Sequence, residues 1–285
     1  MNCQLCGSDN LTVLTTALRN GGGTVLYCGN CDFGILKDQV QDPERYYAEE
    51  YRKTHRNAPD EETPEQIYNN TKDFQGRRLA RLEIYGKERG ALLEAGCSAG
   101  QFISQVKGHT VYGVEYDGRC REFVHDRFGI LVYGAMPLYQ CGFDYVCMFQ
   151  VLEHISDPIK YLNDINGLLK PRGRVFIEVP NINDHLRIVP EYNKFYFHEA
   201  HNWYFSEKSL TKLCELTGFF QIALEALQDY GIRNYFHWLY KGRPIGRLGL
   251  MPEVMNELQE ADSRYRTAVE LNGTASNLFA VWEKK

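Results

Sequence analysis

The chain has 285 residues, of which 44% are hydrophobic, and a formal net charge of −5 at pH 7. This length suits one sizeable domain with a small appendage, and the apolar share is enough for a buried core. No stretch is dense in Lys and Arg, which argues against a nucleic-acid partner because clustered cations bind phosphate backbones. No apolar run approaches the roughly 20 residues that cross a bilayer, so we expect no membrane association. The N-terminus lacks the apolar region of a secretory signal, and the cysteines number nine, so we expect a reducing cytoplasm.

Residues 1–38 contain four cysteines in two closely spaced pairs. Two residues separate Cys3 from Cys6, and two separate Cys28 from Cys31. This spacing lets both thiolates of a pair face one point, and two pairs supply four soft ligands for tetrahedral zinc. Because four thiolates close the coordination shell, we expect a zinc ribbon with structural rather than catalytic metal. The alternative is a set of unpaired cysteines in a small core.

Residues 39–66 differ in composition from what precedes and follows them. They are polar, contain several prolines and acids, and include the tyrosines Tyr46, Tyr47 and Tyr51. We predict a linker or lid that becomes ordered against the next domain. Its tyrosines could cover a cofactor, or they could pack between the two modules.

From residue 67 to the end, strand-like and helix-like segments alternate. Strands separated by helices imply a parallel sheet that is covered on both faces, and the long aromatic segment at about 228–275 is expected to be a helical insertion. The expected helices are 67–87, 101–106, 118–127 and 158–169, the expected strands are 91–95, 111–115, 130–133, 143–149, 174–179, 219–227 and 277–283, and a stop and turn is expected at 170–173.

The segment Glu94–Gly100 carries the chain from a strand into the next element on small residues. Small side chains are needed where backbone approaches a ligand closely, and open α/β sheets bind ligands at the carboxyl ends of their strands. The dinucleotide fingerprint is not met, because Ser98 replaces its second glycine and Gln101 its third. An ordinary strand-to-helix turn is the alternative to a ligand site.

A second acid favours the ligand site. Glu115 ends the next expected strand, about 20 residues after Glu94, which is the place where a carboxylate accepts hydrogen bonds from the ribose hydroxyls of a nucleoside cofactor. The two acids together therefore predict a nucleoside-binding edge.

With these motifs, about residues 70–225 resemble the class I S-adenosylmethionine-dependent methyltransferases. The turn Glu94–Gly100 matches the first motif, although the family usually has glycine at the place of Ser98. Gly113–Asp117 matches the second motif, and Phe149–Pro158 closely matches a VLEHxxDP segment. Further matches are Leu168–Gly173, with an arginine for the first glycine of LLKPGG, and the segments His201–Ser206, Ser209–Leu210 and Leu216–Phe219.

The resemblance implies a Rossmann-like, doubly wound α/β fold with a mostly parallel seven-stranded sheet at 67–285. It also implies S-adenosylmethionine as cofactor, with Glu115 on the ribose and Ala135 and Met136 at the adenine. The residues that the resemblance places at the cofactor are Glu94, Gly96, Cys97, Ser98, Gly100, Phe102, Glu115, Tyr116, Ala135, Met136, Gln150, Val151 and His154.

The four cysteines, the tyrosine linker and this domain together resemble a narrower group. That group includes bacterial deoxysugar C-methyltransferases and methyltransferases found with surface-polysaccharide genes. Its usual His-Glu-His is replaced here by His198-Glu199-Ala200-His201, in which the glutamate is displaced by one position. We therefore favour O-methylation over C-methylation.

Methyl transfer from a sulfonium needs alignment of the nucleophile and exclusion of water, and a hydroxyl nucleophile also needs a base. Histidine suits this role near neutral pH, and the candidates are His201, His198 and His154, with Glu199 as orienter. Capping or backbone bonding is the alternative for His201. A structural role beside the cofactor is the alternative for His154, and solvation or ion pairing for Glu199.

We predict methyl transfer to a small-molecule acceptor, a sugar or surface-polysaccharide (capsule) precursor, by a monomer or homodimer. One competing function is an RNA methyltransferase whose zinc module grips RNA. Another is a cofactor-binding protein without catalytic activity, on the same scaffold.

Overall fold

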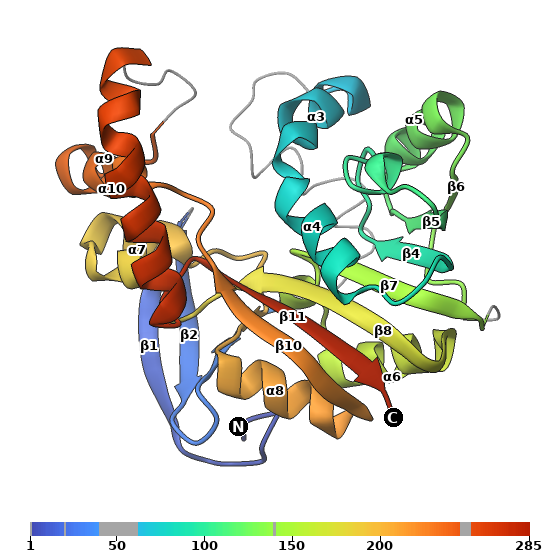
Figure 1. Cartoon of the computed structure of the whole chain (residues 1–285). Coiled ribbons are helices and arrows are strands. Elements are labelled where there is room, and N and C mark those ends of the chain that lie inside the picture. Colours follow the sequence, from blue (N-terminus) through green and yellow to red (C-terminus); the bar gives the residue numbers. More distant parts are fainter. Residues whose placement is uncertain (1, 20, 40–61, 139–140, 246–251) are drawn as a thin grey trace. The chain divides into compact units, whose positions relative to one another are not determined.

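The computed structural model describes residues 2–19, 21–39, 62–138, 141–245 and 252–285 (Figure 1). Most of the predicted linker, with Tyr46, Tyr47 and Tyr51, lies outside the described residues. The chain divides into two compact units, each built from separate stretches of sequence. The first unit comprises Met1–Gln39, Glu178–Leu213 and Ala223–Ala280, and the second comprises Val40–Ile177, Cys214–Ile222 and Val281–Lys285.

A seven-stranded sheet forms the α/β fold and confirms the predicted Rossmann-like class. Its strand order is β10-β11-β8-β7-β4-β5-β6, and β4 pairs in parallel with both β5 and β7, as β5 does with β6. β11 runs opposite to β8 in Figure 1, so the sheet is mostly, not wholly, parallel. The strands are β4 (Ala91–Ala95), β5 (Thr110–Val114), β6 (Leu131–Tyr133), β7 (Phe143–Phe149), β8 (Leu169–Pro180), β10 (Phe219–Leu227) and β11 (Asn277–Lys284).

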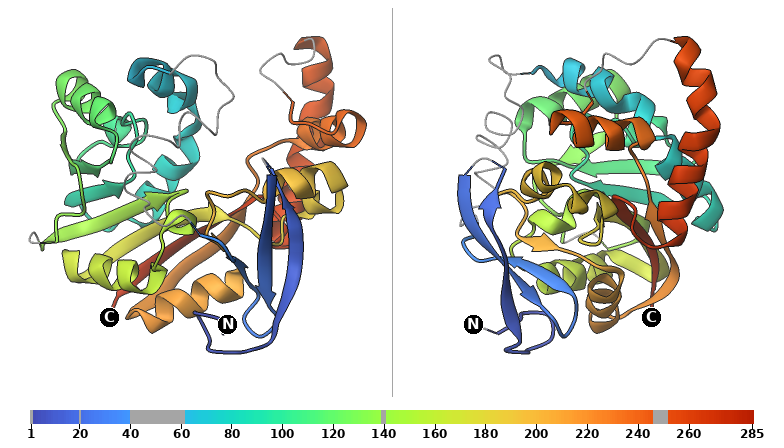
Figure 2. Two further views of the ribbon diagram at one scale, coloured as in Figure 1. Left: turned by 180° about the vertical axis from the view of Figure 1, so that it is seen from behind. Right: turned by 90° about the vertical axis from the view of Figure 1, so that its left-hand side faces the viewer.

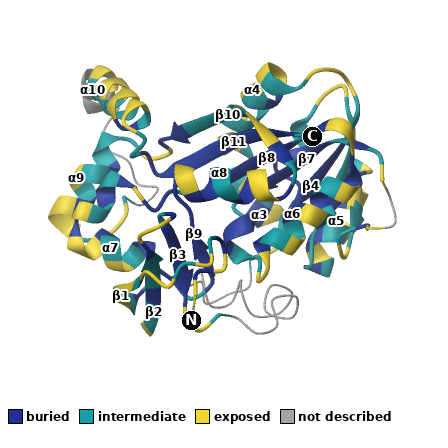
Figure 3. Ribbon diagram, turned by 90° about the horizontal axis from the view of Figure 1, so that it is seen from below, coloured by how far each residue is buried: buried dark blue, intermediate teal, exposed yellow. Residues whose placement is uncertain are grey.

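The strands are apolar for most of their length, which places the core along the sheet. Every residue of β7 except Asp144 is buried, and β8 is buried from Val175 to Val179 (Figure 3). Buried runs of this kind are typical of parallel strands covered on both faces. The helices of this fold are α3 (Pro64–Thr71), α4 (Gly76–Tyr85), α5 (Gly118–Phe128), α6 (Pro158–Leu168) and α8 (Glu207–Leu216), with 3-10 turns η2 (Lys72–Phe74), η3 (Ile103–Gln105) and η4 (Leu152–His154).

Two helix predictions were wrong. The helix expected at 101–106 is only the 3-10 turn η3, which lies between left-handed residues at Gly100 and Gly108. A side chain takes the place of a helical backbone hydrogen bond here, because the side-chain amide of Gln105 donates to the backbone carbonyl of Gln101 at 2.6 Å. The helix expected at 67–87 is divided into α3, η2 and α4.

The stop and turn expected at 170–173 was also wrong, because β8 continues through it. Arg172 has a positive φ of 62°, yet the strand is held on both sides. Lys170 donates to Asp144 of β7 at 2.8 Å, and Arg172 and Arg174 donate to Glu283 of β11 at 3.1 and 2.9 Å. Cross-strand ion pairs thus extend the strand beyond its apolar part.

A second, four-stranded sheet belongs to the first unit. Its order is β1-β2-β3-β9, with β1 (Leu11–Leu18), β2 (Gly21–Cys28), β3 (Phe33–Leu36) and β9 (Trp203–Tyr204). β1 and β2 form the long hairpin drawn in blue in Figure 2. This unit also contains η5 (His185–Ile188), α7 (Pro190–Tyr196), α9 (Ile232–Lys241) and α10 (Pro252–Leu271). Among the described residues, no helix has the length and apolar character needed to span a membrane.

Candidate functional site

The register of four neighbouring strands brings four loops to one edge of the large sheet. Ala95 of β4 is paired with Val114 of β5 and with Met148 of β7, and Val114 is paired with Tyr133 of β6. Because these strands are parallel and end at the same level, the segments that follow them share an edge. Those segments contain most of the predicted cofactor residues, namely Gly96, Cys97, Ser98, Gly100, Glu115, Tyr116, Ala135, Met136, Gln150, Val151 and His154.

The turn after β4 has a left-handed backbone at three residues, and its two glycines are closely packed. Gly96, Ser98 and Gly100 have φ values of 69°, 50° and 80°, in the left-handed region that favours glycine. A Cβ on Gly96 would lie 2.7 Å from a methyl of Val151, and one on Gly100 would lie 2.9 Å from Val124. Ser98 adopts this conformation although it is not glycine. The serine that stands here in place of the usual glycine therefore keeps the conformation of the turn.

Glu115 closes the turn from the next strand. Its carboxylate accepts hydrogen bonds from the backbone N–H groups of Ser98, at 2.8 Å, and of Asp117, at 2.9 Å. Asp117 is buried and caps α5 by accepting from the N–H of Arg119 at 3.0 Å. The predicted ribose-binding acid is therefore held at the edge of the sheet beside the small-residue turn.

Glu94, the one acid of β4, is buried. Burial raises its pKa to about 8, although Arg78 and the Ile103 backbone N–H act to lower it. Its Oε2 finds no hydrogen-bond partner among the described residues. A buried carboxyl oxygen without a hydrogen-bond partner is costly, so this atom is suited to a polar or cationic group of a bound molecule.

The other predicted cofactor residues differ in their exposure. Cys97 is buried beneath the turn, and Phe102 is buried and packs edge-on against Phe149 at 4.9 Å between ring centroids. Gln150 has a left-handed φ of 58° directly after β7. Tyr116, Met136, Gln150, Val151 and His154 are partly exposed, and Ala135 is exposed, so these six residues have surface that a ligand can contact.

The other histidine candidates belong to the first unit, where one tyrosine fixes their loop. The Tyr204 hydroxyl accepts from the N–H of His198 and donates to its carbonyl, both at 3.1 Å. The rings of His198 and His201 lie 3.6 Å apart between centroids. The Ala200 N–H donates to Nδ1 of His198 at 3.3 Å, so a neutral His198 carries its proton on Nε2. His198 is buried, whereas His201 and Glu199 are partly exposed.

The four N-terminal cysteines converge on one point. Their sulfur atoms all lie within 4.8 Å of one another, with 3.6 Å between Cys3 and Cys31 and 3.5 Å between Cys6 and Cys28. None forms a disulfide. A tetrahedral zinc with bonds of about 2.3 Å would separate its sulfurs by about 3.8 Å, so this cluster has the dimensions of a four-thiolate site.

Gly7, which follows the first pair, is left-handed with φ 72°, and the left-handed residue after the second pair is Asp32, with φ 54°.

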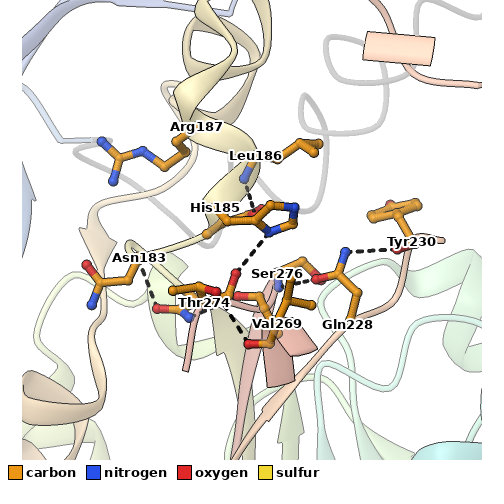
Figure 4. A network of polar contacts seen from close by, with 12 residues as sticks. Asn183, His185, Leu186, Arg187, Gln228, Tyr230, Val269, Thr274 and Ser276 are labelled. Carbon is orange, nitrogen blue, oxygen red and sulfur yellow. Dashed lines mark hydrogen bonds and ion pairs between the residues drawn. The ribbon is translucent and has the colours of Figure 1, made fainter. Parts of the chain in front are cut away.

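A polar network after β8 was missed by the sequence analysis. The Nδ1 of His185 donates to the Thr274 carbonyl at 3.1 Å (Figure 4). Its Nε2 is 2.7 Å from the Tyr265 hydroxyl. Asp184 accepts from the Tyr192 hydroxyl at 2.6 Å, and burial raises its pKa. The signal in the sequence was the polar run Asn181–His185, which directly follows a buried strand.

Asp184, His185 and Thr274 of this network border a pocket of about 750 Å³ in the first unit. Its charged lining residues carry both signs. They are Asp32, Asp184, Arg187, Glu207 and Lys208.

A family described as "Methyltransferase domain" matches residues 67–223. The chain belongs to this family. A tRNA U34 carboxymethyltransferase from Campylobacter jejuni is 31% identical over 117 residues, which are 40% of each chain, so the chain spans less than half of that relative's length.

Two solved structures share the fold. An S-adenosylmethionine-dependent methyltransferase from Archaeoglobus fulgidus superposes with a TM-score of 0.52 at 19% identity, over 77% of this chain and 97% of that one. Phosphoethanolamine N-methyltransferase 2 from Haemonchus contortus, in complex with S-adenosylmethionine, gives 0.52 at 16% identity, over 94% of this chain and 70% of that one.

These findings confirm the prediction of an S-adenosylmethionine-dependent methyltransferase. The loops at the edge of the large sheet fit the cofactor that the family implies. Glu94 offers a buried oxygen without a donor, Gly96 has the left-handed backbone that glycine favours, and Glu115 is a fixed acceptor.

Proposed function

We propose that this enzyme transfers a methyl group to a polar small-molecule acceptor, a sugar or surface-polysaccharide precursor, with O-methylation favoured over C-methylation. The observation that carries the proposal is the shared edge where the β4 turn, Glu94 and Glu115 meet. When bound, S-adenosylmethionine supplies a methyl group already activated on a sulfonium. The chain's own residues must then hold the cofactor, orient the acceptor and remove its proton.

We assign the two edge acids distinct tasks in holding the cofactor. Glu115 would accept hydrogen bonds from the ribose hydroxyls. Both of its carboxylate oxygens already accept backbone N–H groups at the carboxyl end of β5, and the hydroxyls would replace some of these donors. Glu94 would face a cationic group, because its buried carboxyl has an oxygen without a donor. The left-handed turn at Gly96 lets backbone approach the ligand.

We assign proton removal to His201, with His198 as its neighbour. His201 is partly exposed, whereas His198 is buried and fixed by Tyr204 and Ala200. The ring contact between the two histidines limits the positions that His201 adopts. A base of this kind suits a hydroxyl nucleophile near neutral pH. His154 and Glu199 remain weaker candidates for base and orienter.

We further propose that residues 1–38 are a structural zinc module, 39–66 a linker or lid, and 67–285 the methyltransferase domain with its insertion at about 228–275. The convergence of four sulfurs supports the zinc. All nine cysteines are free of disulfides, which fits a reducing cytoplasm. Metal analysis tests the module: about one zinc per chain is expected, with loss in Cys28→Ser, and a folded, metal-free protein would contradict it.

The charge of the pocket in the first unit supports a neutral, hydroxyl-rich acceptor. Lys208 is 3.5 Å from Asp32, and Nε of Arg187 donates to the side chain of Asn193 at 3.1 Å. Both acidic and basic residues line the pocket, whereas a phosphate backbone calls for a cationic surface. A sugar offers donors and acceptors that match such a lining.

The tRNA-modifying relative from Campylobacter jejuni favours a second candidate, an RNA acceptor. A cofactor-binding role without catalysis is a third. Incubation with methyl-labelled S-adenosylmethionine separates them: label should pass to sugar nucleotides and not to bulk tRNA. Tight tRNA binding that weakens steeply from low to high salt would instead support RNA, and label on no acceptor of either class would support binding alone.

A further inference from the structure

Strand β3 connects the cysteine cluster to the histidine loop within the first unit. It begins two residues after Cys31, and all four of its residues are buried. On one side it pairs with β2, with Cys28 opposite Phe33. On its other side it pairs antiparallel with β9, with Ile35 opposite Trp203. The strand therefore lies between the metal-binding cysteines and the chain that follows His201.

The side chains at this junction are closely packed. Phe33 stacks on Trp203 with 5.3 Å between ring centroids and an angle of 11°, and it also lies 5.3 Å from Phe205. Gly34 leaves no space for a side chain, because a Cβ there would lie 2.8 Å from Cβ of Tyr204. The Leu36 N–H donates to the Asn202 carbonyl at 2.9 Å.

The start of the histidine loop is held by the same small sheet. Arg19, which follows β1, donates from its backbone N–H to the Phe197 carbonyl and from Nε to the Phe195 carbonyl, both at 2.7 Å. Its guanidinium lies 3.6 Å from the centroid of the Phe195 ring. Residues 195–205 are therefore fixed at both ends by β1 and β3, with His198 and His201 between the two attachments.

We propose that the cysteine module positions the histidine loop, and that Phe33 and Gly34 are positioning residues for methyl transfer. This rests on the proposed function in one respect, the role of His201 as base. A metal held by the four thiolates would fix Cys28 and Cys31, and with them the turn that leads into β3, which pairs with β9. The residues assigned to the cofactor lie in other segments, so loss of the metal should affect the base and not cofactor binding.

Hydrogen–deuterium exchange of the full chain tests this coupling. After a chelator removes the metal, exchange at 197–205 should rise at least tenfold, and Zn²⁺ should restore protection. Residues 91–98, which comprise β4 and the start of the turn after it, should stay protected. The dissociation constant of S-adenosylmethionine should change less than twofold. Unchanged exchange at 197–205 would overturn the proposal, as would an equal rise at 91–98, because the effect would then be global.

Phe33→Leu tests the same coupling with the metal in place. We expect unchanged zinc content, faster exchange at 201–205 and about tenfold lower kcat, with KM for S-adenosylmethionine unchanged. Val13→Ala is the matched control, because Val13 is exposed on β1 of the same sheet. Exchange in Phe33→Leu equal to that in the control would refute the proposal. If His201→Ala leaves kcat unchanged, the base assignment fails, while the exchange data still decide whether the module holds the loop.

Discussion

Replacing Glu94 by glutamine should change the pH dependence of stability. Burial raises the pKa of this acid to about 8 in the folded chain, from an ordinary value of 4.5. The folded state therefore binds the proton more tightly than the unfolded state. The resulting contribution to the free energy of unfolding is fully present below pH 4.5 and is lost as the pH rises to about 8.

The size of the effect follows from the difference between the two pKa values. At about 1.4 kcal/mol for each tenfold change in proton affinity, the loss is up to about 5 kcal/mol between pH 4.5 and 8. Glu94→Gln carries no titratable proton at this position. The variant and the wild type should be similar in stability at pH 5, and the variant should be more stable by several kcal/mol at pH 9.

Urea denaturation of both proteins at pH values from 5 to 9 measures this difference. Glu83→Gln is the control, because Glu83 is exposed on α4, and its stability should follow the wild type. Parallel curves for Glu94→Gln and wild type would refute the reasoning. A cationic cofactor beside Glu94 should also lower its pKa, so calorimetry in buffers of different ionisation enthalpy should detect proton release on binding at pH 7.

The other predictions concern the cofactor, the base and the sheet. Glu115→Ala should weaken S-adenosylmethionine binding by about 10- to 100-fold in calorimetry, since a charged hydrogen-bond acceptor contributes about 1.5–3 kcal/mol, whereas Glu122→Ala on the exposed side of α5 should not. His201→Ala should lower kcat by about 100-fold or more with unchanged cofactor affinity. Ion pairing offsets burial and lowers the pKa of Glu283 to about 2, so Glu283→Gln should lose about 3 kcal/mol of stability at pH 7 in urea denaturation. That loss should shrink as the pH falls from 4.5 to 2, and a loss that does not vary with pH would contradict it.

The cofactor edge could be predicted from sequence because its signals are local. An acid and small residues at the end of a buried strand define Glu94–Gly100, and a second acid one strand later defines Glu115. Parallel strands then place both at one edge without further information. The strand order itself confirms this, since β4 lies between β5 and β7.

Errors arose where distant contacts override local pattern. Lys170–Gly173 has the composition of a turn, but ion pairs with Asp144 and Glu283 keep it in β8. The polar run after β8 could not be assigned, because its partners Tyr265 and Thr274 are about 80 to 90 residues away. Nothing within either segment encodes these partners.

The contact between the cysteine module and the histidine loop is the clearest case of this limit. The spacing of four cysteines predicts a metal, and the resemblance around His201 predicts a base, but no local pattern pairs β3 with β9. The pairing depends on Gly34, whose missing side chain admits Tyr204, and on Phe33, whose ring matches Trp203. The methyl group of an alanine at position 34 would push β3 away from β9, although the hydrogen bonds of the sheet fix the distance between these strands. We infer that the sequence of the cysteine module must match that of the histidine loop for the two to pack. Chimeras that exchange only one of them with another methyltransferase should lose methyl transfer while keeping cofactor binding.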